Sequence, residues 1–102
     1  MHVKDCCEGF GPTGLEIGDK VQVIEGQARN AIRCAPQKNA ELRARIRPGR
    51  KMKVLYGPVC VEKIIWWYVR TKGAETETGK EIDGRVEGWT AEWFEDEGYY
   101  LE

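Results

Sequence analysis

The cysteines and the single histidine are the residues of this chain that could act as nucleophiles or bind a metal ion. The cysteines are Cys6, Cys7, Cys34 and Cys60, and the histidine is His2. A catalytic thiolate needs a base beside its sulfur, and no spacing in the sequence brings His2 to a cysteine. A structural zinc site needs Cys-x2-Cys pairs, which the sequence lacks. We therefore predict no catalytic thiol, no metal site and no cofactor.

An even number of cysteines in a small chain permits a disulfide but does not require one. Adjacent Cys6 and Cys7 are awkward to bridge to each other, because the short ring is strained. Cys34 and Cys60 each follow the expected end of a strand, so a Cys34–Cys60 disulfide is the candidate pairing. The alternative is that both residues are small buried thiols.

The carboxylates and glycines give no sign of an active site either. No acidic residue near the C-terminus lies in an apolar run of the kind that surrounds a catalytic carboxylic acid. The glycine-rich segment GFGPTG, residues 9–14, contains a proline and neither follows a strand nor opens a helix, so it is not a phosphate loop. We predict that the protein is not an enzyme.

The aromatic residues carry the stronger signal, which is one of binding. In the segment IIWWYVR, residues 64–70, a strand would turn Trp67 inward and Trp66 and Tyr68 outward. Exposed Trp and Tyr side chains give a partner rigid contact area at low entropic cost. The alternative is that the N-terminal segment or the loop at residues 72–84 covers them. The candidate ligand-contacting residues are Trp66, Tyr68, Arg33, Arg70 and Trp93.

Basic residues concentrate in the middle of the chain and acidic residues near its end. Residues 29–53 include nine basic residues and one acid, and residues 75–102 include ten acids and two basic residues. These charges can neutralise each other once strands pair. Alternatively, the stripe of Arg43, Arg45 and Arg47 binds an anion or single-stranded nucleic acid, as small β-barrels can. The formal net charge of −1 and the acidic end argue against nucleic acid.

Short segments separated by turns predict an all-β fold, a small barrel or sandwich. Leu42, Ala44 and Ile46 alternate strictly with arginines, and Met52, Val54 and Tyr56 share one face of the next predicted strand. Residues 72–84 are predicted to form a long hairpin loop, and residues 91–98 one helical turn. Gly88, directly before Trp89, indicates a bulge or a close backbone approach. The predicted organisation is a lead-in at residues 1–18 and one domain at residues 19–102.

The order of these segments resembles the bacterial SH3 domain family (SH3b). That family runs from an Asn-Val-Arg-Ser-Gly-Pro start through a Pro-Gly turn, a Trp-Tyr-x-Val strand and a Gly-Trp-Val strand to a closing Tyr-Leu. The matching segments here are residues 31–36 (AIRCAP), 47–49 (RPG), 66–70 (WWYVR), 87–92 (EGWTAE) and 99–102 (YYLE). The resemblance covers about residues 20–102. Ala35 and Cys34 depart from the Gly and Ser of the pattern.

The resemblance implies an SH3-like barrel of five to six short antiparallel strands that serves as a non-catalytic targeting module. In envelope proteins such modules bind a cell-wall glycan or peptide, or a protein partner. Self-association through exposed strand edges is a third option. No apolar run approaches the roughly 18 residues that span a bilayer, and no signal peptide is visible. The resemblance suggests the cell envelope or the extracellular space if the chain is part of a longer protein.

Overall fold

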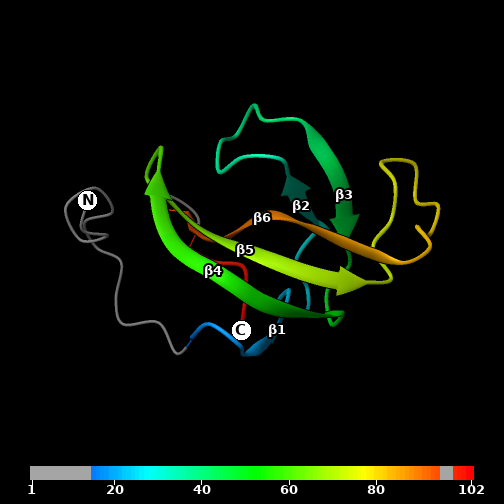
Figure 1. Ribbon diagram of the computed structural model, residues 1–102, viewed down its shortest axis with the longest axis horizontal. Helices are drawn as coiled ribbons and strands as arrows, with labels where there is room; N and C mark the ends of the chain where they lie inside the picture. The colour runs from blue at the N-terminus through cyan, green and yellow to red at the C-terminus, as the bar shows by residue number, and fades with distance from the viewer. Residues whose placement is uncertain (1–14, 95–97) are drawn as a thin grey trace.

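A curled antiparallel β-sheet forms the body of the protein (Figure 1). The computed structural model describes residues 15–94 and 98–102. Within these ranges there are seven strands and no helix. The strands are β1 (Lys20–Gln22), β2 (Asn30–Arg33), β3 (Leu42–Ile46), β4 (Lys51–Val61), β5 (Ile64–Lys72), β6 (Arg85–Phe94) and β7 (Gly98–Tyr99).

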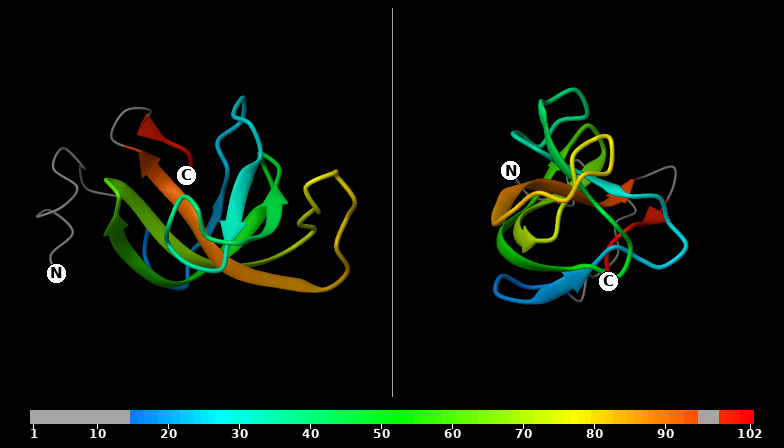
Figure 2. Two further views of the ribbon diagram at one scale, coloured as in Figure 1. Left: turned by 90° about the horizontal axis from the view of Figure 1, so that it is seen from above. Right: turned by 90° about the vertical axis from the view of Figure 1, so that its right-hand side faces the viewer.

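The strand order in the sheet is β1-β4-β5-β6-β2-β3, with β7 paired to β6. Strands β4, β5 and β6 form one long curved layer, and β2 and β3 rise from its β6 side, so that the sheet curls into a half-barrel (Figure 2). Every strand pair is antiparallel. The predicted all-β antiparallel fold is therefore confirmed. The prediction of five to six short strands is wrong in detail: the described residues form seven strands, and two of them are long, since β4 has 11 residues and β6 has 10.

The helical turn predicted at residues 91–98 is wrong where the structure describes it. Strand β6 continues through Phe94, and Trp93 pairs with Tyr99 of β7. The alternation of buried and exposed positions fails here because all four β6 residues from Thr90 to Trp93 are buried, whichever face they point to. A strand covered on both faces has no period of two for the sequence to reveal.

Both edge strands of the sheet are partly covered by other segments of the same chain. The backbone of Gln22 in β1 exchanges hydrogen bonds with Glu102, and Val23 bridges to Leu101. At the other edge, Arg45 of β3 exchanges backbone hydrogen bonds with Glu75. These bonds occupy N–H and C=O groups through which a second copy could add a strand.

The main core fills the inside of the curl. It takes apolar side chains from six of the strands and from the C-terminal segment, and Trp67 is its largest fully buried member. The Trp67 indole Nε1 donates a 2.7 Å hydrogen bond to Oε1 of Glu92, which is also buried. The inward orientation predicted for Trp67 is confirmed. Trp93 is 7% exposed and belongs to the same core, so its predicted role as a ligand contact is wrong.

The close backbone approach predicted at Gly88 is confirmed. A Cβ atom at this position would lie 2.7 Å from the carbonyl oxygen of Arg33 and 2.7 Å from Cγ2 of Ile32. Strand β2 meets β6 here, where Arg33 pairs with Trp89. The absence of a side chain at residue 88 lets the β2–β3 hairpin lie against the sheet.

Trp66 is buried rather than exposed, which corrects the prediction that it forms an outer surface. It points away from the main core, as the alternation requires, but only 3% of its surface is exposed. A second apolar cluster covers it, made of Ile64 and Ala91 with the half-buried Val59, Val61, Trp89 and Phe94. Val59 and Ala91 pair with Trp66 on the flanking strands β4 and β6, and Val61 and Phe94 pair with Ile64, so strand pairing sets these side chains around the indole.

The proposed disulfide between Cys34 and Cys60 is also wrong. Cys34 is an exposed free thiol that accepts a 3.1 Å hydrogen bond from Nε of Arg43, whereas Cys60 is buried in β4 and disulfide-bonded. Strand β2, which precedes Cys34, pairs with β3 and β6, while β4 pairs with β1 and β5. Cys34 therefore follows a strand that is not a neighbour of the strand that carries Cys60. Cys6, Cys7 and His2 lie outside the described residues.

Ion pairs hold the hairpin loop between β5 and β6 against β3 and against the residues that flank β2 and β3. The Glu75 carboxylate binds Nη1 of Arg29 at 3.2 Å and Nε of Arg47 at 2.6 Å, and Glu77 binds Nε of Arg45 at 3.0 Å. Partial burial raises the pKa of Glu75, but the hydrogen bonds and charges of the two arginines outweigh it and lower the pKa. The predicted neutralisation of the basic middle by the acidic end is thus confirmed for these arginines.

Candidate functional site

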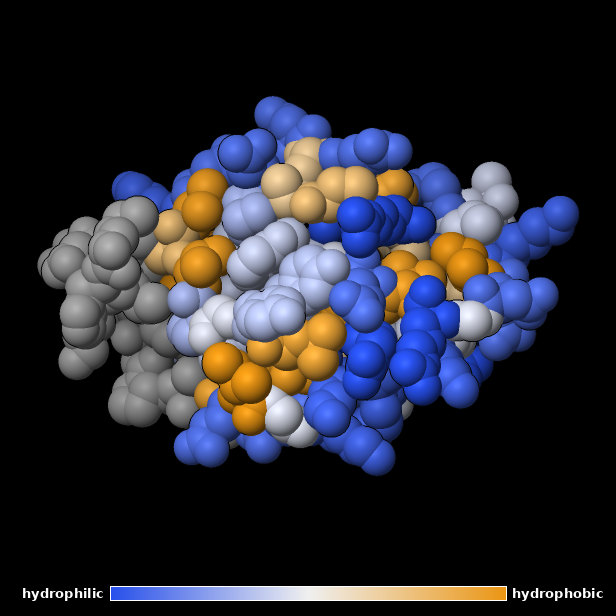
Figure 3. Space-filling view, in the orientation of Figure 1, coloured by the Kyte–Doolittle hydropathy of each residue, from blue (hydrophilic) through white to orange (hydrophobic). Residues whose placement is uncertain are grey.

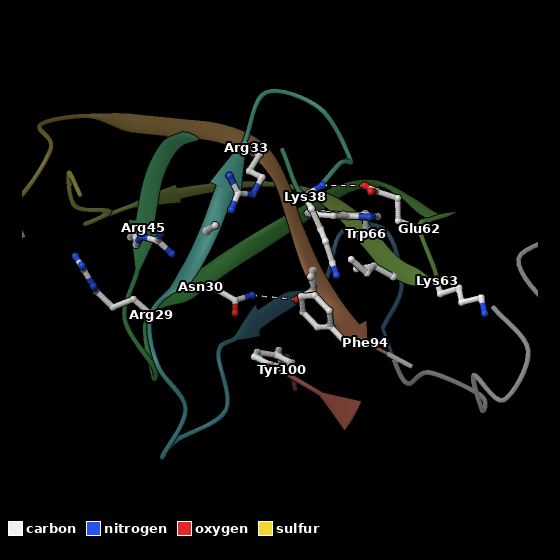
Figure 4. A pocket seen from close by; sticks show the side chains of 13 residues that line it. Arg29, Asn30, Arg33, Lys38, Arg45, Glu62, Lys63, Trp66, Phe94 and Tyr100 are labelled. Atoms are coloured by element: carbon white, nitrogen blue, oxygen red, sulfur yellow. Dashed lines mark hydrogen bonds between the residues drawn. The ribbon is translucent and has the colours of Figure 1, made fainter. Parts of the chain in front are cut away.

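A cleft of about 590 Å³ opens on the outer side of the sheet, between β2 and the ends of β5 and β6 (Figure 4). Three groups of side chains line it: cations, aromatic rings and a few small or polar residues. The lining residues are Arg29, Asn30, Ala31, Arg33, Lys38, Arg45, Glu62, Lys63, Ile64, Trp66, Ala91, Phe94 and Tyr100. A volume of this size lies within the roughly 300–1,000 Å³ of typical ligand pockets.

Five cations and one carboxylate give the cleft a positive charge. Figure 4 places Arg29 and Arg45 at one end and Lys63 at the other. Arg29 and Arg45 are held by the ion pairs described above, so their charge is largely offset. Among the residues that the structure describes, no carboxylate lies within ion-pair distance of the ammonium of Lys38 or Lys63. The same holds for Arg33, so within the described residues Lys38, Lys63 and Arg33 carry the uncompensated charge of the cleft.

Arg33 stands between the two lysines and the paired arginines. Its Nη1 donates a 3.1 Å hydrogen bond to the carbonyl oxygen of Ala40, which fixes the guanidinium against the loop after β2. The backbone N–H of Lys38 in that loop donates to Oε1 of Glu62 at 2.9 Å. The loop is thereby tied to the β4–β5 turn, and the cations are held on one rim of the cleft.

The β4–β5 turn presents Glu62 and Lys63 to the cleft in an unfavourable backbone conformation. Val61 pairs with Ile64, so the hairpin has a two-residue loop, and both of its residues have φ of 60°. This is the geometry of a type I′ turn, which Asn-Gly satisfies best. Left-handed φ costs a residue with a side chain on the order of 1 kcal/mol or more. The turn is therefore less stable than one made of Asn-Gly, and it places two charged side chains at the cleft.

Replacing Lys63 by glycine is expected to stabilise the domain by about 1 kcal/mol, because glycine adopts this φ without a steric penalty. Urea unfolding followed by tryptophan fluorescence measures the change. Lys63→Gln is the matched control, since it removes the charge and keeps the side chain, and we expect it to leave stability unchanged. A Lys63→Gly variant no more stable than Lys63→Gln would contradict the presence of strain at this turn.

Three aromatic rings form the apolar part of the cleft. The rings of Phe94 and Tyr100 lie 4.9 Å apart between centroids at an interplanar angle of 58°, and both are half-buried. Trp66 shows only an edge, because its Nε1 donates to the carbonyl oxygen of Val61 at 3.2 Å and its faces are packed. The Lys38 side chain extends past Trp66 toward Phe94 (Figure 4). Positive charge and open aromatic surface thus lie side by side.

A second aromatic surface crosses the outer face of β4, β5 and β6. Tyr56, Tyr68 and Trp89 are register partners on these three strands, and we call them the aromatic row. Their ring centroids are 5.5 Å and 5.4 Å apart, and Tyr56 is 62% exposed. Figure 3 shows pale and apolar side chains gathered over this face, with hydrophilic ones around them. The row adjoins the cleft, because Trp89 packs in the same cluster as Trp66.

The residues predicted to bind a ligand are distributed over these places. Arg33 and Trp66 line the cleft, and Tyr68 lies in the aromatic row. Arg70 lies two residues after Tyr68 on the same face of β5, where it pairs with Lys53 of β4 and Glu87 of β6. Trp93 lies in the core. The sequence interpretation missed Lys38, Lys63, Phe94 and Tyr100 as cleft residues. Only the excess of basic residues in the middle of the chain signalled Lys38.

Within residues 15–94 and 98–102 no three His, Cys, Asp or Glu residues come together in a way that could hold a metal ion. The same ranges contain no helix long and apolar enough to cross a membrane. Comparison of the chain with protein-family models, curated proteins and solved structures gave no match.

Proposed function

We propose that this chain is a non-catalytic, SH3-like binding module and that its ligand is an anion bound in the cleft. The observation that carries the proposal is the uncompensated charge of Lys38 and Lys63 beside Arg33 in one cleft. Cations on a rim where the described lining includes one carboxylate, that of Glu62, attract anions by long-range and contact electrostatics. The strained turn that presents Lys63 supports the proposal, because stability is commonly lost where side chains serve a function.

A labelled short-chain polyphosphate tests the proposed anion site. We expect it to bind the wild-type chain at low salt, and we expect the double variant Lys38→Glu and Lys63→Glu to lose at least tenfold in affinity, because two attractive contacts become repulsive. Fluorescence anisotropy in 20 mM salt measures the affinity.

The matched control carries Lys72→Glu and Lys80→Glu, which change the net charge equally but lie outside the cleft and are exposed. This control is expected to lose clearly less affinity than the cleft variant, since its two charges act on the anion from a distance and not at contact. Equal losses in the two double variants would show that binding follows net charge alone and would overturn the cleft as the site.

A second candidate function is supported by the aromatic row. Tyr56 and Tyr68 offer flat, accessible rings of the kind that bind a cell-wall glycan or a protein partner. This is the ligand class that the resemblance to the SH3b family implies. Retention on purified cell-wall sacculi, compared between the wild type and Tyr68→Ala, tests whether the aromatic row binds such a ligand. We change Tyr68 and not Trp66 because Trp66 is buried.

A further inference from the structure

We infer that the anion bound in the cleft is single-stranded nucleic acid, held by its phosphates on one rim and by a stacked base against Phe94 and Tyr100. The inference rests on the proposed function and adds the chemical class of the ligand. It comes from two features that occur together in one cleft: cations that form no ion pair with any residue the structure describes, and half-buried aromatic rings.

The cations suit a chain of phosphates better than a single anion. Lys38 comes from the loop after β2, Arg33 from the end of β2 and Lys63 from the β4–β5 turn, so they are spread along the rim and do not converge on one point (Figure 4). A pocket for one compact anion would bring its donors to a common centre. A rim of separated charges instead tracks a backbone that carries a charge at every repeat.

The aromatic rings add a feature that a simple phosphate polymer would not use. Phe94 and Tyr100 are half-buried and tilted against each other, so each keeps part of its surface exposed in the cleft that Lys38 also lines. Stacking of a base on such rings is tolerant of sequence, because every base has a π-face. In a duplex these faces are already stacked, and a cleft of about 590 Å³ has no room for two paired strands.

The polar residues of the cleft predict weak sequence preference. Both hydrogens of the Asn30 amide are used inside the protein, by Oγ1 of Thr90 and the carbonyl oxygen of Ala91, each at 3.0 Å. Arg33 donates one N–H to Ala40, and its remaining donors are assigned here to a phosphate and not to a base edge. Base-edge recognition needs side-chain donors that are free to pair with the base.

The test compares binding of labelled dT12 and of labelled polyphosphate of similar charge to the full chain, by anisotropy over a salt series. We expect dT12 to bind more tightly than polyphosphate. The slope of log K against log salt for dT12 should be about −2, since three cations neutralise three phosphates at about 0.7 ion each. Changing Lys38 and Lys63 to Gln should make the slope shallower by about 1.4.

The variant Phe94→Leu measures the contribution of base stacking to the affinity separately from that of charge. Leucine keeps the apolar contact with the second cluster, which thermal unfolding will verify, but it offers no flat face. We expect this variant to lower the affinity for dT12 by about fivefold or more, the loss of one stacked base, and to leave polyphosphate binding unchanged. Tyr56→Leu in the aromatic row is the matched control, and it should leave both affinities unchanged.

Three outcomes would overturn the inference. If polyphosphate binds as tightly as dT12 and Phe94→Leu weakens neither, the anion site stands and nucleic acid is not its ligand. If Tyr56→Leu weakens dT12 binding as much as Phe94→Leu, the strand lies on the aromatic row instead. If neither polymer binds at low salt, the proposed anion site itself is wrong.

Discussion

Replacing Gly88 by alanine is expected to destabilise the domain by about 3 kcal/mol, at the upper end of the usual cost of overpacking. The added methyl group would lie 2.7 Å from a backbone carbonyl oxygen of β2, and a backbone cannot rotate away as a flexible side chain can. Relief requires β2 to move off β6. Urea unfolding followed by tryptophan fluorescence measures the loss.

Gly79→Ala serves as the control for this prediction. Gly79 has φ of +91° and nothing within 4 Å of its Cβ position, so alanine there meets backbone strain without a clash. We expect a cost of about 1 kcal/mol. Equal costs at the two positions would show that β2 and β6 tolerate a side chain between them, contrary to the packing described.

The Gly88→Ala variant should also bind polyphosphate more weakly, because the cleft depends on the place of β2. Arg33 lies directly at the contact with Gly88 and also lines the cleft. A displacement of β2 moves this cation away from Lys63 on the opposite turn.

Replacing Glu92 by alanine is expected to destabilise the domain by about 3 kcal/mol. The Trp67 indole N–H, now 2.7 Å from the carboxylate, would be left buried without this acceptor, and a small cavity would form beside it. A buried donor without a partner costs roughly 1–3 kcal/mol, and the lost side-chain packing adds to it. Chemical unfolding of the purified variant measures the effect.

A double-mutant cycle assigns this loss to the hydrogen bond. In a Trp67→Phe background there is no indole N–H to leave unpaired, so Glu92→Ala should cost at least about 1 kcal/mol less than in the wild type. Glu92→Gln retains an acceptor oxygen and should cost less than Glu92→Ala. Additive effects in the cycle would mean that Glu92 acts through its other contacts.

Local sequence features predicted the parts of the fold that depend on neighbouring residues. The alternation of Leu42, Ala44 and Ile46 gave β3 its strand assignment, and β3 spans those residues. A glycine directly before Trp89 indicated a close backbone approach, which the structure shows. These features act within a few residues, so a linear sequence contains them in full.

Register shifts mark where the alternation stopped being informative. Strand β4 shifts its pairing with β5 between Val54 and Tyr56 and again between Tyr56 and Val59. Tyr56 was expected on the face of Met52 and Val54, which are buried, and instead it is largely exposed. A bulge adds an unpaired residue and reverses the side-chain direction beyond it, and the sequence interpretation placed none in this strand.

The two adjacent tryptophans show which features the sequence predicts by itself and which only the tertiary structure decides. Period two in the sequence is enough to direct Trp66 and Trp67 to opposite faces of β5 and to place Trp67 in the core. Whether the outer face is exposed or covered depends on which strands pair, and the pairing of β5 with β4 and β6 sets Val59, Val61 and Phe94 around Trp66.

The cleft has the same origin, since its cations and rings come from residues 29–45, 62–66 and 91–100. Chain segments that far apart meet only through long-range strand pairing. The residue types were therefore readable from the sequence, but their proximity follows from the sheet alone, because contact between distant segments is a property of the packed chain.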